Sequence, residues 1–127
     1  MTATEKIDLS PFYSSENFYK HWLGMIYTDG VKFVADQCGA YWLIDVIASH
    51  QPKARRDPML RDFQIWTIIS KPTKQNPHRV IVECFRDTGC EASIKQTIPY
   101  SDFPFERMPD DFKLYVENGT ICLPSER

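Results

Sequence analysis

Residues 27–52 read YTDGVKFVADQCGAYWLIDVIASHQP, and this stretch decides the fold because it holds the strongest helical pattern in the chain. Thr28 or Asp29 supplies a good N-cap, and apolar side chains recur at helical spacing as far as Cys38. Beyond Gly39 a second apolar stripe begins, which on one straight helix would face away from the first. A straight helix covered on both sides would satisfy this pattern. Glycine tolerates the dihedrals that end a helix, however, so Gly39 favours a break that turns both stripes towards one core.

The remainder of the chain shows the alternation of apolar and polar residues that is typical of β-strands. The segment 93–100 is the most polar, as an edge strand would be. Asn118-Gly119 predicts a type I′ hairpin turn. Short connections between the segments imply antiparallel pairing. We therefore expect an α+β fold, in which an antiparallel sheet of four to five strands packs against a helical segment broken near Gly39. The four clearest strand segments are 62–70, 78–85, 93–100 and 112–124.

The length of 127 residues fits one domain, because two separate cores would each be too small to be stable. We expect residues 1–11 to form a flexible N-terminal arm and residues 12–127 to form a single α+β domain. Within this domain the aromatic-rich segment 14–22 favours a short strand, although Ser14 or Ser15 would also suit the N-cap of a helix.

Charge and hydropathy exclude several classes of protein. The formal net charge of −2 gives no global field that would attract nucleic acid or an anionic membrane. No apolar run approaches the roughly 20 residues that are needed to span a bilayer. The first residues are polar and lack the apolar core of a signal peptide. We therefore expect a cytoplasmic protein without membrane contact.

The reactive side chains show no spacing that is typical of a known chemistry. The four cysteines lack C-x-x-C spacing, and we expect three of them to be buried as small hydrophobes while Cys90 meets solvent in a turn. The three histidines are scattered, without the spacing of a zinc-binding helix. Residues 87–89, Asp-Thr-Gly, match the triplet of aspartic proteases but also suit an ordinary turn. We predict no catalytic residue, no metal ligand and no cofactor.

Asp45 interrupts the apolar run of the second helical segment, and two hypotheses explain it. On a helix, Tyr41, Asp45 and Ser49 align at spacings of four, opposite the main apolar stripe. In the first hypothesis they form a structural polar face, with Asp45 as a hydrogen-bond acceptor, because an unpaired buried carboxylate would cost several kcal/mol. In the second they form a binding strip, in which Tyr41 and Trp42 flank the acid.

Basic residues gather in the loop 53–61, where Arg55 and Arg56 are adjacent. A solvated loop is one hypothesis for this cluster. The other is a local contact with an anion or with nucleic acid, made by these two arginines. The acidic segment 102–117 of a second copy of the chain is a further partner that the loop would suit.

Three motifs carry a resemblance to a known family: T-D-G-V at 28–31, A-Y-W-L-x-D at 40–45 and L-P-S-E at 123–126. In these motifs, and over residues 12–126 as a whole, the chain resembles a family of small bacterial, plasmid and phage proteins described as a domain of unknown function. The resemblance supports the fold boundaries and implies an origin in a mobile element. It brings no activity and no catalytic residues with it.

These observations favour a non-enzymatic binding or regulatory protein that acts through contacts with an unknown protein partner. The first alternative is a small hydrolase-like enzyme with a pocket around Asp45 and Tyr41, in which Asp45 or Asp29 would act. The second, less favoured, is contact with nucleic acid through the 53–61 loop.

A homodimer is also expected, because the segment 62–70 is apolar on both of its sides. A domain of this size cannot bury every apolar side chain. Either the helices and the N-terminal aromatic residues cover the second side, or another copy does, and twofold dimers are the commonest oligomers. One side carries Trp66 and Ile68, and the other carries Phe63, Ile65 and Ile69.

Overall fold

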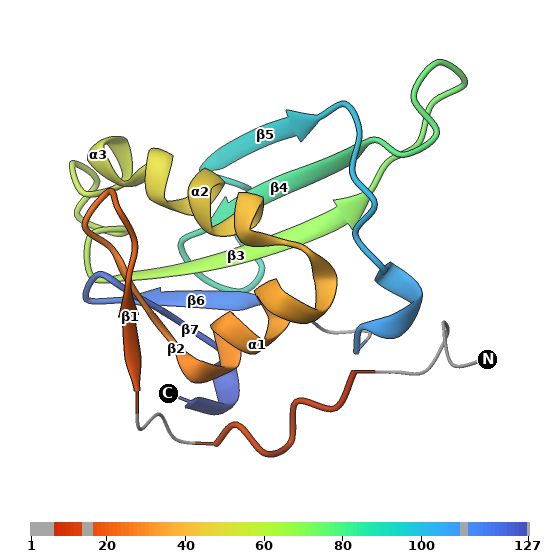
Figure 1. Ribbon diagram of the computed structural model, residues 1–127. Coiled ribbons are helices and arrows are strands. Elements are labelled where there is room, and N and C mark those ends of the chain that lie inside the picture. Colours follow the sequence, from red (N-terminus) through yellow and green to blue (C-terminus); the bar gives the residue numbers. More distant parts are fainter. Residues whose placement is uncertain (1–6, 14–16, 110–111, 127) are drawn as a thin grey trace.

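The computed structural model of the protein describes residues 7–13, 17–109 and 112–126 (Figure 1). These residues form an α+β fold in which a seven-stranded sheet packs against three α-helices. The strands are β1 (Phe18–Lys20), β2 (Ile26–Thr28), β3 (Phe63–Ser70), β4 (Val80–Phe85), β5 (Ile94–Ile98), β6 (Leu114–Glu117) and β7 (Thr120–Cys122). The helices are α1 (Asp29–Cys38), α2 (Tyr41–Ser49) and α3 (Gln51–Ala54), with 3₁₀ turns η1 (Phe105–Arg107) and η2 (Pro124–Glu126).

The strand order is β1-β2-β7-β6-β3-β4-β5, and all neighbours are antiparallel except β2 and β7, which run parallel. The α+β class is confirmed, whereas the expected antiparallel sheet of four to five strands is wrong, because the described residues form a mixed sheet of seven. β1 confirms a short strand within 14–22, of which residues 14–16 lie outside the described part. β2 was missed because three residues are too few to show alternation.

Gly39 breaks the helical segment, which confirms the expectation drawn from its sequence position. Its backbone is left-handed, with φ 60° and ψ 36°, and its N–H donates to the carbonyl of Ala35 to close α1. α2 begins at Tyr41, so the buried residues of both helices join one core. At the other end of α1, the hydroxyl of Thr28 caps the helix by accepting the N–H of Val31.

The three helices lie on the same side of the sheet (Figure 1). The sheet face beneath them carries Trp66, which is buried in the main core with its ring 5.9 Å from that of His50. The opposite face carries the alternate residues of each strand. There the strand register places Tyr115, Ile65 and Phe85 in one row across β6, β3 and β4.

A buried pair of amides fixes the start of α3 on β3. Gln51 and Gln64 exchange two side-chain hydrogen bonds of 2.9 Å, and the indole N–H of Trp66 donates to Gln64 Oε1 at 2.8 Å. The carbonyls of Ile47 and Leu60 accept further hydrogens from the two amides. Because these buried polar groups are partnered, the network fixes geometry without leaving a desolvated group unsatisfied. It holds α3 at a defined place against the sheet.

Two segments from distant parts of the sequence meet at the N-terminus of α1. The carboxylate of Glu126 accepts from the Thr28 hydroxyl at 2.6 Å, the Gly30 N–H at 3.1 Å and the Leu123 N–H at 2.9 Å. Negative charge is stabilising at this end of a helix. A Cβ on Gly30 would lie 2.6 Å from Glu126 Oε1 and 2.6 Å from a Leu123 methyl carbon. Any larger residue at this position would force the side chains of Glu126 and Leu123 to move. We call this arrangement the Glu126 lock.

The described part of the expected N-terminal arm lies along the domain. It begins at Ile7, whose side chain is buried and whose N–H donates to the carbonyl of Arg107 at 2.6 Å. Further on, Phe12 packs on Phe33 of α1, with ring centroids 5.0 Å apart. Residues 1–6 of the arm lie outside the described residues. In the part of the chain that is described, no helix is long and apolar enough to cross a membrane.

Candidate functional site

Asp45 lies on the exposed side of α2 but is paired with a buried partner. Its side chain is 56% exposed, and its Oδ1 lies 2.6 Å from Nε2 of His21, which is only 7% exposed. The Nδ1 atom of His21 accepts the backbone N–H of Leu23 at 3.0 Å. The proton of the neutral ring is therefore on Nε2, which donates it to Asp45. Asp45 thus accepts a hydrogen bond within the fold, as the structural hypothesis requires, and its donor is an imidazole.

The other members of the predicted strip make separate contacts. Tyr41 and Ser49 are exposed beside Asp45, as the helical wheel predicts. The hydroxyl of Tyr41 donates to Asp36 on α1, while that of Ser49 donates to the carbonyl of Val46 within the helix. Trp42 is half-buried against the core. The structure therefore places these residues along one helix, where each makes a different contact.

The His21–Asp45 pair supports a hairpin that presents large apolar side chains to solvent. The turn between β1 and β2 is closed by hydrogen bonds from His21 N to the Met25 carbonyl at 2.7 Å and from Gly24 N to the His21 carbonyl at 2.9 Å. At its tip Trp22 is 80% exposed, although its ring stacks on that of His21 at 5.6 Å. Exposed apolar clusters of this kind mark interaction sites. We call the following set the hairpin surface: Phe18, Trp22, Leu23 and Ile26, all exposed.

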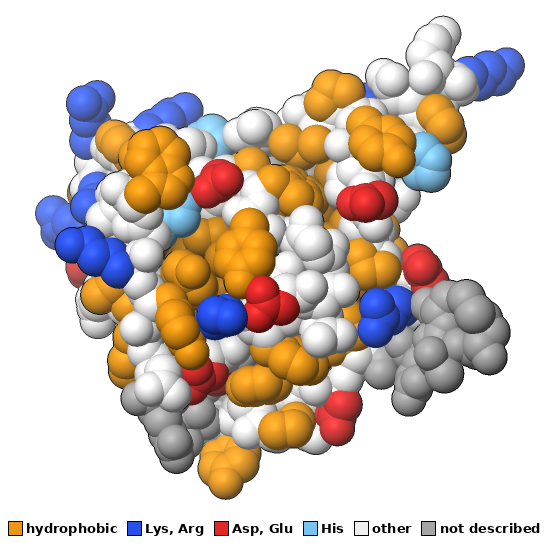
Figure 2. All heavy atoms as spheres, viewed as in Figure 1, with side chains coloured by type: hydrophobic (Ala, Val, Ile, Leu, Met, Phe, Trp, Pro, Cys, Tyr) orange, Lys and Arg blue, Asp and Glu red, His pale blue; other side chains and the backbone are white. Residues whose placement is uncertain are grey.

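A basic residue at the C-terminal end of α3 lies next to this hairpin. Arg55 Nη2 is 3.9 Å from the position that a Cβ would take on Gly119, and the carbonyl of Gly119 accepts the N–H of Ile26 in β2 at 3.4 Å. Figure 2 shows basic side chains gathered at the end of the molecule where α3 and the hairpin lie, beside hydrophobic surface. We call Lys53, Arg55 and Arg56, which are all exposed, the basic cluster.

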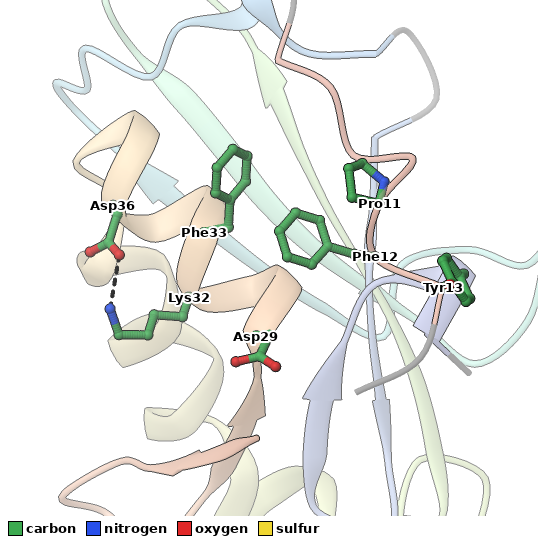
Figure 3. A pocket seen from close by; sticks show the side chains of 7 residues that line it. All are labelled: Pro11, Phe12, Tyr13, Asp29, Lys32, Phe33 and Asp36. Atoms are coloured by element: carbon green, nitrogen blue, oxygen red, sulfur yellow. Dashed lines mark hydrogen bonds and ion pairs between the residues drawn. The ribbon is translucent and has the colours of Figure 1, made fainter. Parts of the chain in front are cut away.

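A groove of about 400 Å³ lies between the segment 11–13 and the outer face of α1 (Figure 3). In this view Phe12 points from the segment towards the helix, while Asp29, Lys32 and Asp36 follow one another along α1. Lys32 and Asp36 form an ion pair of 2.9 Å. Asp29 accepts the hydroxyl of Tyr19 at 2.9 Å. The groove thus has an aromatic wall and a row of charged groups, each already held by a neighbour.

Hydrogen bonds shift the pKa of side chains in and beside the groove. Hydrogen bonds from the Tyr41 hydroxyl and from Lys32 hold the pKa of Asp36 below its usual value. The hydrogen bond to Asp36 raises the pKa of Tyr41 and also that of Lys32. Likewise, the hydrogen bond to Asp29 raises the pKa of Tyr19. General acids and bases need pKa values near the working pH, and these four groups have moved away from neutrality. Across the described residues, moreover, no group of three or more His, Cys, Asp or Glu could hold a metal ion.

Sequence reasoning identified the strip and the arginines but missed the hairpin surface. The segment Trp22-Leu23-Gly24 does carry a signal, since two large apolar residues beside a glycine suggest an exposed turn. That signal was masked by the neighbouring aromatic residues, which suggested a strand that would bury them. Arg55 and Arg56 are exposed as expected, and the structure adds that Arg55 lies close to Gly119, which pairs with the hairpin.

Comparison with known proteins identifies a family. No curated protein and no solved structure matches the chain. The model of a family described as "Family of unknown function (DUF6876)" matches residues 3–127, which include the hairpin, α3 and the Glu126 lock. The match thus covers nearly the whole sequence, and the chain belongs to this family of unknown function, DUF6876.

Proposed function

We propose that the domain is a non-enzymatic binding or regulatory protein that acts through protein–protein contacts, and that the hairpin surface is its contact site. The observation that carries this proposal is the state of Trp22, which is 80% exposed and yet held in place by its ring contact with His21. A tryptophan is the residue most often found as an energetic anchor in protein interfaces.

The energy available from this anchor is large. A tryptophan buries about 150–250 Å² when it is covered. At about 25 cal/mol per Å², covering the exposed four-fifths of the Trp22 side chain contributes about 3–5 kcal/mol before the costs of association. Those costs are reduced because His21, paired with Asp45, already orients the indole ring. Leu23 and Phe18 extend the apolar area on the same hairpin.

The hydrolase-like alternative would place its chemistry around Asp45 and Tyr41, with Asp45 or Asp29 acting. Asp45 is exposed on α2 and bonded to His21, while the groove in Figure 3 is lined by Asp29 and Asp36. Asp36 is already paired with Lys32 in that groove. The proposal of a protein contact is therefore better supported than turnover.

A homodimer remains part of the proposal, as do a cytoplasmic location and an origin in a mobile element. The dimer is supported by the sheet face opposite the helices, where Ile69, Ile81 and Phe85 are only half-buried. A second copy packed on that face would leave the hairpin surface open to a different partner. Light scattering should then give twice the chain mass of 14.8 kDa, and Phe85→Glu should restore the monomer. A constant monomer mass up to high micromolar concentration would refute the dimer.

The proposed contact site is tested with a pair of matched variants. Trp22→Ala removes the anchor, and Tyr100→Ala removes another exposed aromatic ring that packs on a histidine, His78, elsewhere in the fold. The tagged proteins are purified from native cells after crosslinking, and their captured proteins are quantified by mass spectrometry. We expect a captured protein that is lost with Trp22→Ala and kept with Tyr100→Ala. Identical capture by all three proteins, with unchanged circular dichroism, would refute the hairpin as the contact site.

A further inference from the structure

We infer that the partner presents an acidic polypeptide segment, whose carboxylates bind Arg55 and Arg56 while an apolar side chain covers Trp22. This inference rests on the proposed function and names the chemistry of its partner. The basic cluster is close to the hairpin. Arg55 approaches Gly119, and the carbonyl of Gly119 accepts a hydrogen bond from Ile26 of the hairpin. One partner segment can therefore contact apolar and basic groups together.

The cations of the basic cluster are not neutralised by their acidic neighbours. Asp57 accepts Arg86 at 2.9 Å and the N–H of Met59 at 2.8 Å, so these partners lie outside the basic cluster. Asp62 lies 3.9 Å from Arg61. Within the described residues, neither Arg55 nor Arg56 forms an ion pair. Two exposed guanidinium groups are therefore available to an incoming carboxylate.

The arginines are also well placed to bind carboxylates in a defined direction. α3 is fixed to β3 through the buried Gln51–Gln64 pair, and Pro52 lies in its first turn. The backbone that carries Arg55 and Arg56 therefore has a fixed position relative to the hairpin. A guanidinium group matches a carboxylate with two parallel hydrogen bonds, which gives directional as well as electrostatic selectivity.

An acidic polypeptide fits this surface better than a nucleic acid or a membrane. A phosphate backbone requires a longer track of cations, and here the carboxyl group of Asp45, which an anion would not favour, contacts the same hairpin through His21. Single-stranded nucleic acids favour aromatic platforms for stacking, whereas this surface also offers the aliphatic Leu23 and Ile26. Tryptophan together with arginine is the composition of energetic centres in protein interfaces.

The test uses a displayed library of random dodecapeptides. The library is selected on the wild-type protein and counter-selected on Trp22→Ala, so that only peptides that need the anchor remain. We expect these peptides to carry Asp or Glu close to a large apolar residue. A synthetic peptide from this set should bind about tenfold more weakly to the Arg55→Gln/Arg56→Gln variant. It should bind unchanged to the control Lys71→Gln/Lys74→Gln, which alters another exposed basic segment.

The outcomes separate the two proposals. Peptides that need Trp22 but carry no acidic residue, with affinity insensitive to the arginine variant, would overturn the acidic partner and leave the contact site standing. Retention on phosphatidylserine vesicles or on oligothymidylate that depends on Arg55 and Arg56, without any selected peptide, would replace the polypeptide with a membrane or a nucleic acid. A synthetic peptide with the sequence of residues 102–117 is tested in parallel. If its binding needs both Trp22 and the two arginines, a second copy of the chain is the partner, and the inference of a separate protein is overturned.

Discussion

Replacing Gly30 with alanine should destabilise the domain strongly, although alanine favours helices. The added Cβ would lie 2.6 Å from both Glu126 Oε1 and a methyl carbon of the buried Leu123. Overpacking of this kind costs about 1–3 kcal/mol, and the loss of one charge-assisted hydrogen bond to Glu126 costs about 1.5–3 kcal/mol. The better helix propensity of alanine offsets about 0.5–1 kcal/mol. We expect a net loss of about 2–5 kcal/mol in the free energy of unfolding.

A double-mutant cycle tests whether this loss acts through the carboxylate. Unfolding in urea, followed by tryptophan fluorescence, is measured for Gly30→Ala, for Glu126→Ala and for the double variant. In the Glu126→Ala background the contact with the carboxylate is gone, so Gly30→Ala should cost about 1.5–3 kcal/mol less than in the wild type. If the stability loss of the double variant equals the sum of the two single losses to within about 0.5 kcal/mol, Glu126 does not lock the start of α1, and the reasoning is wrong.

Three further predictions concern individual side chains. Asp45→Ala should lower the free energy of unfolding by about 1 kcal/mol, because the buried Nε2–H of His21 loses its acceptor; an unchanged urea midpoint would contradict this. The depressed pKa of Asp36 means that its ionised form stabilises the fold above the ordinary value of 3.8, and that this contribution is lost as the pH falls further. Asp36→Asn should therefore lose less stability than the wild type between neutral pH and acid, as measured by urea unfolding at each pH. Burial raises the pKa of Cys38 to about 11 and that of Cys84 to about 12, and Cys122 is also buried. A thiol reagent should therefore modify Cys90 alone in the native protein. After denaturation it should modify all four cysteines.

The parts of the fold that were predictable depend on local chemistry. The left-handed conformation of Gly39 and the cap by Thr28 follow from residue type and position, and the turn at Asn118-Gly119 has positive φ at both residues, as a type I′ turn requires. The parallel pairing of β2 with β7 was not predictable. It brings together segments from opposite halves of the sequence, and nothing within either three-residue strand specifies the other.

In the candidate site, too, positions within a helix were predictable, whereas contacts between residues distant in sequence were not. Helical spacing correctly placed Asp45 on the polar side of α2, yet its donor, His21, lies 24 residues earlier in a turn that has no helical or strand period. The exposure of Trp22 depends on which way the hairpin turns, which is set by its contacts with α2 and β7. A single aromatic residue in the sequence does not indicate whether the fold will bury it.

The Glu126 lock has a consequence for the order in which the chain folds. The hydrogen bond between Thr28 and Glu126 joins residues 98 positions apart, and β2 likewise pairs with β7 from the far end of the sequence. Contacts between residues so distant in sequence slow folding, because a long loop must close before they contribute. During synthesis, β2 and the start of α1 leave the ribosome long before their partners exist. The N-terminal half therefore has to remain unaggregated, with its aromatic residues uncovered, until the last-made strand arrives.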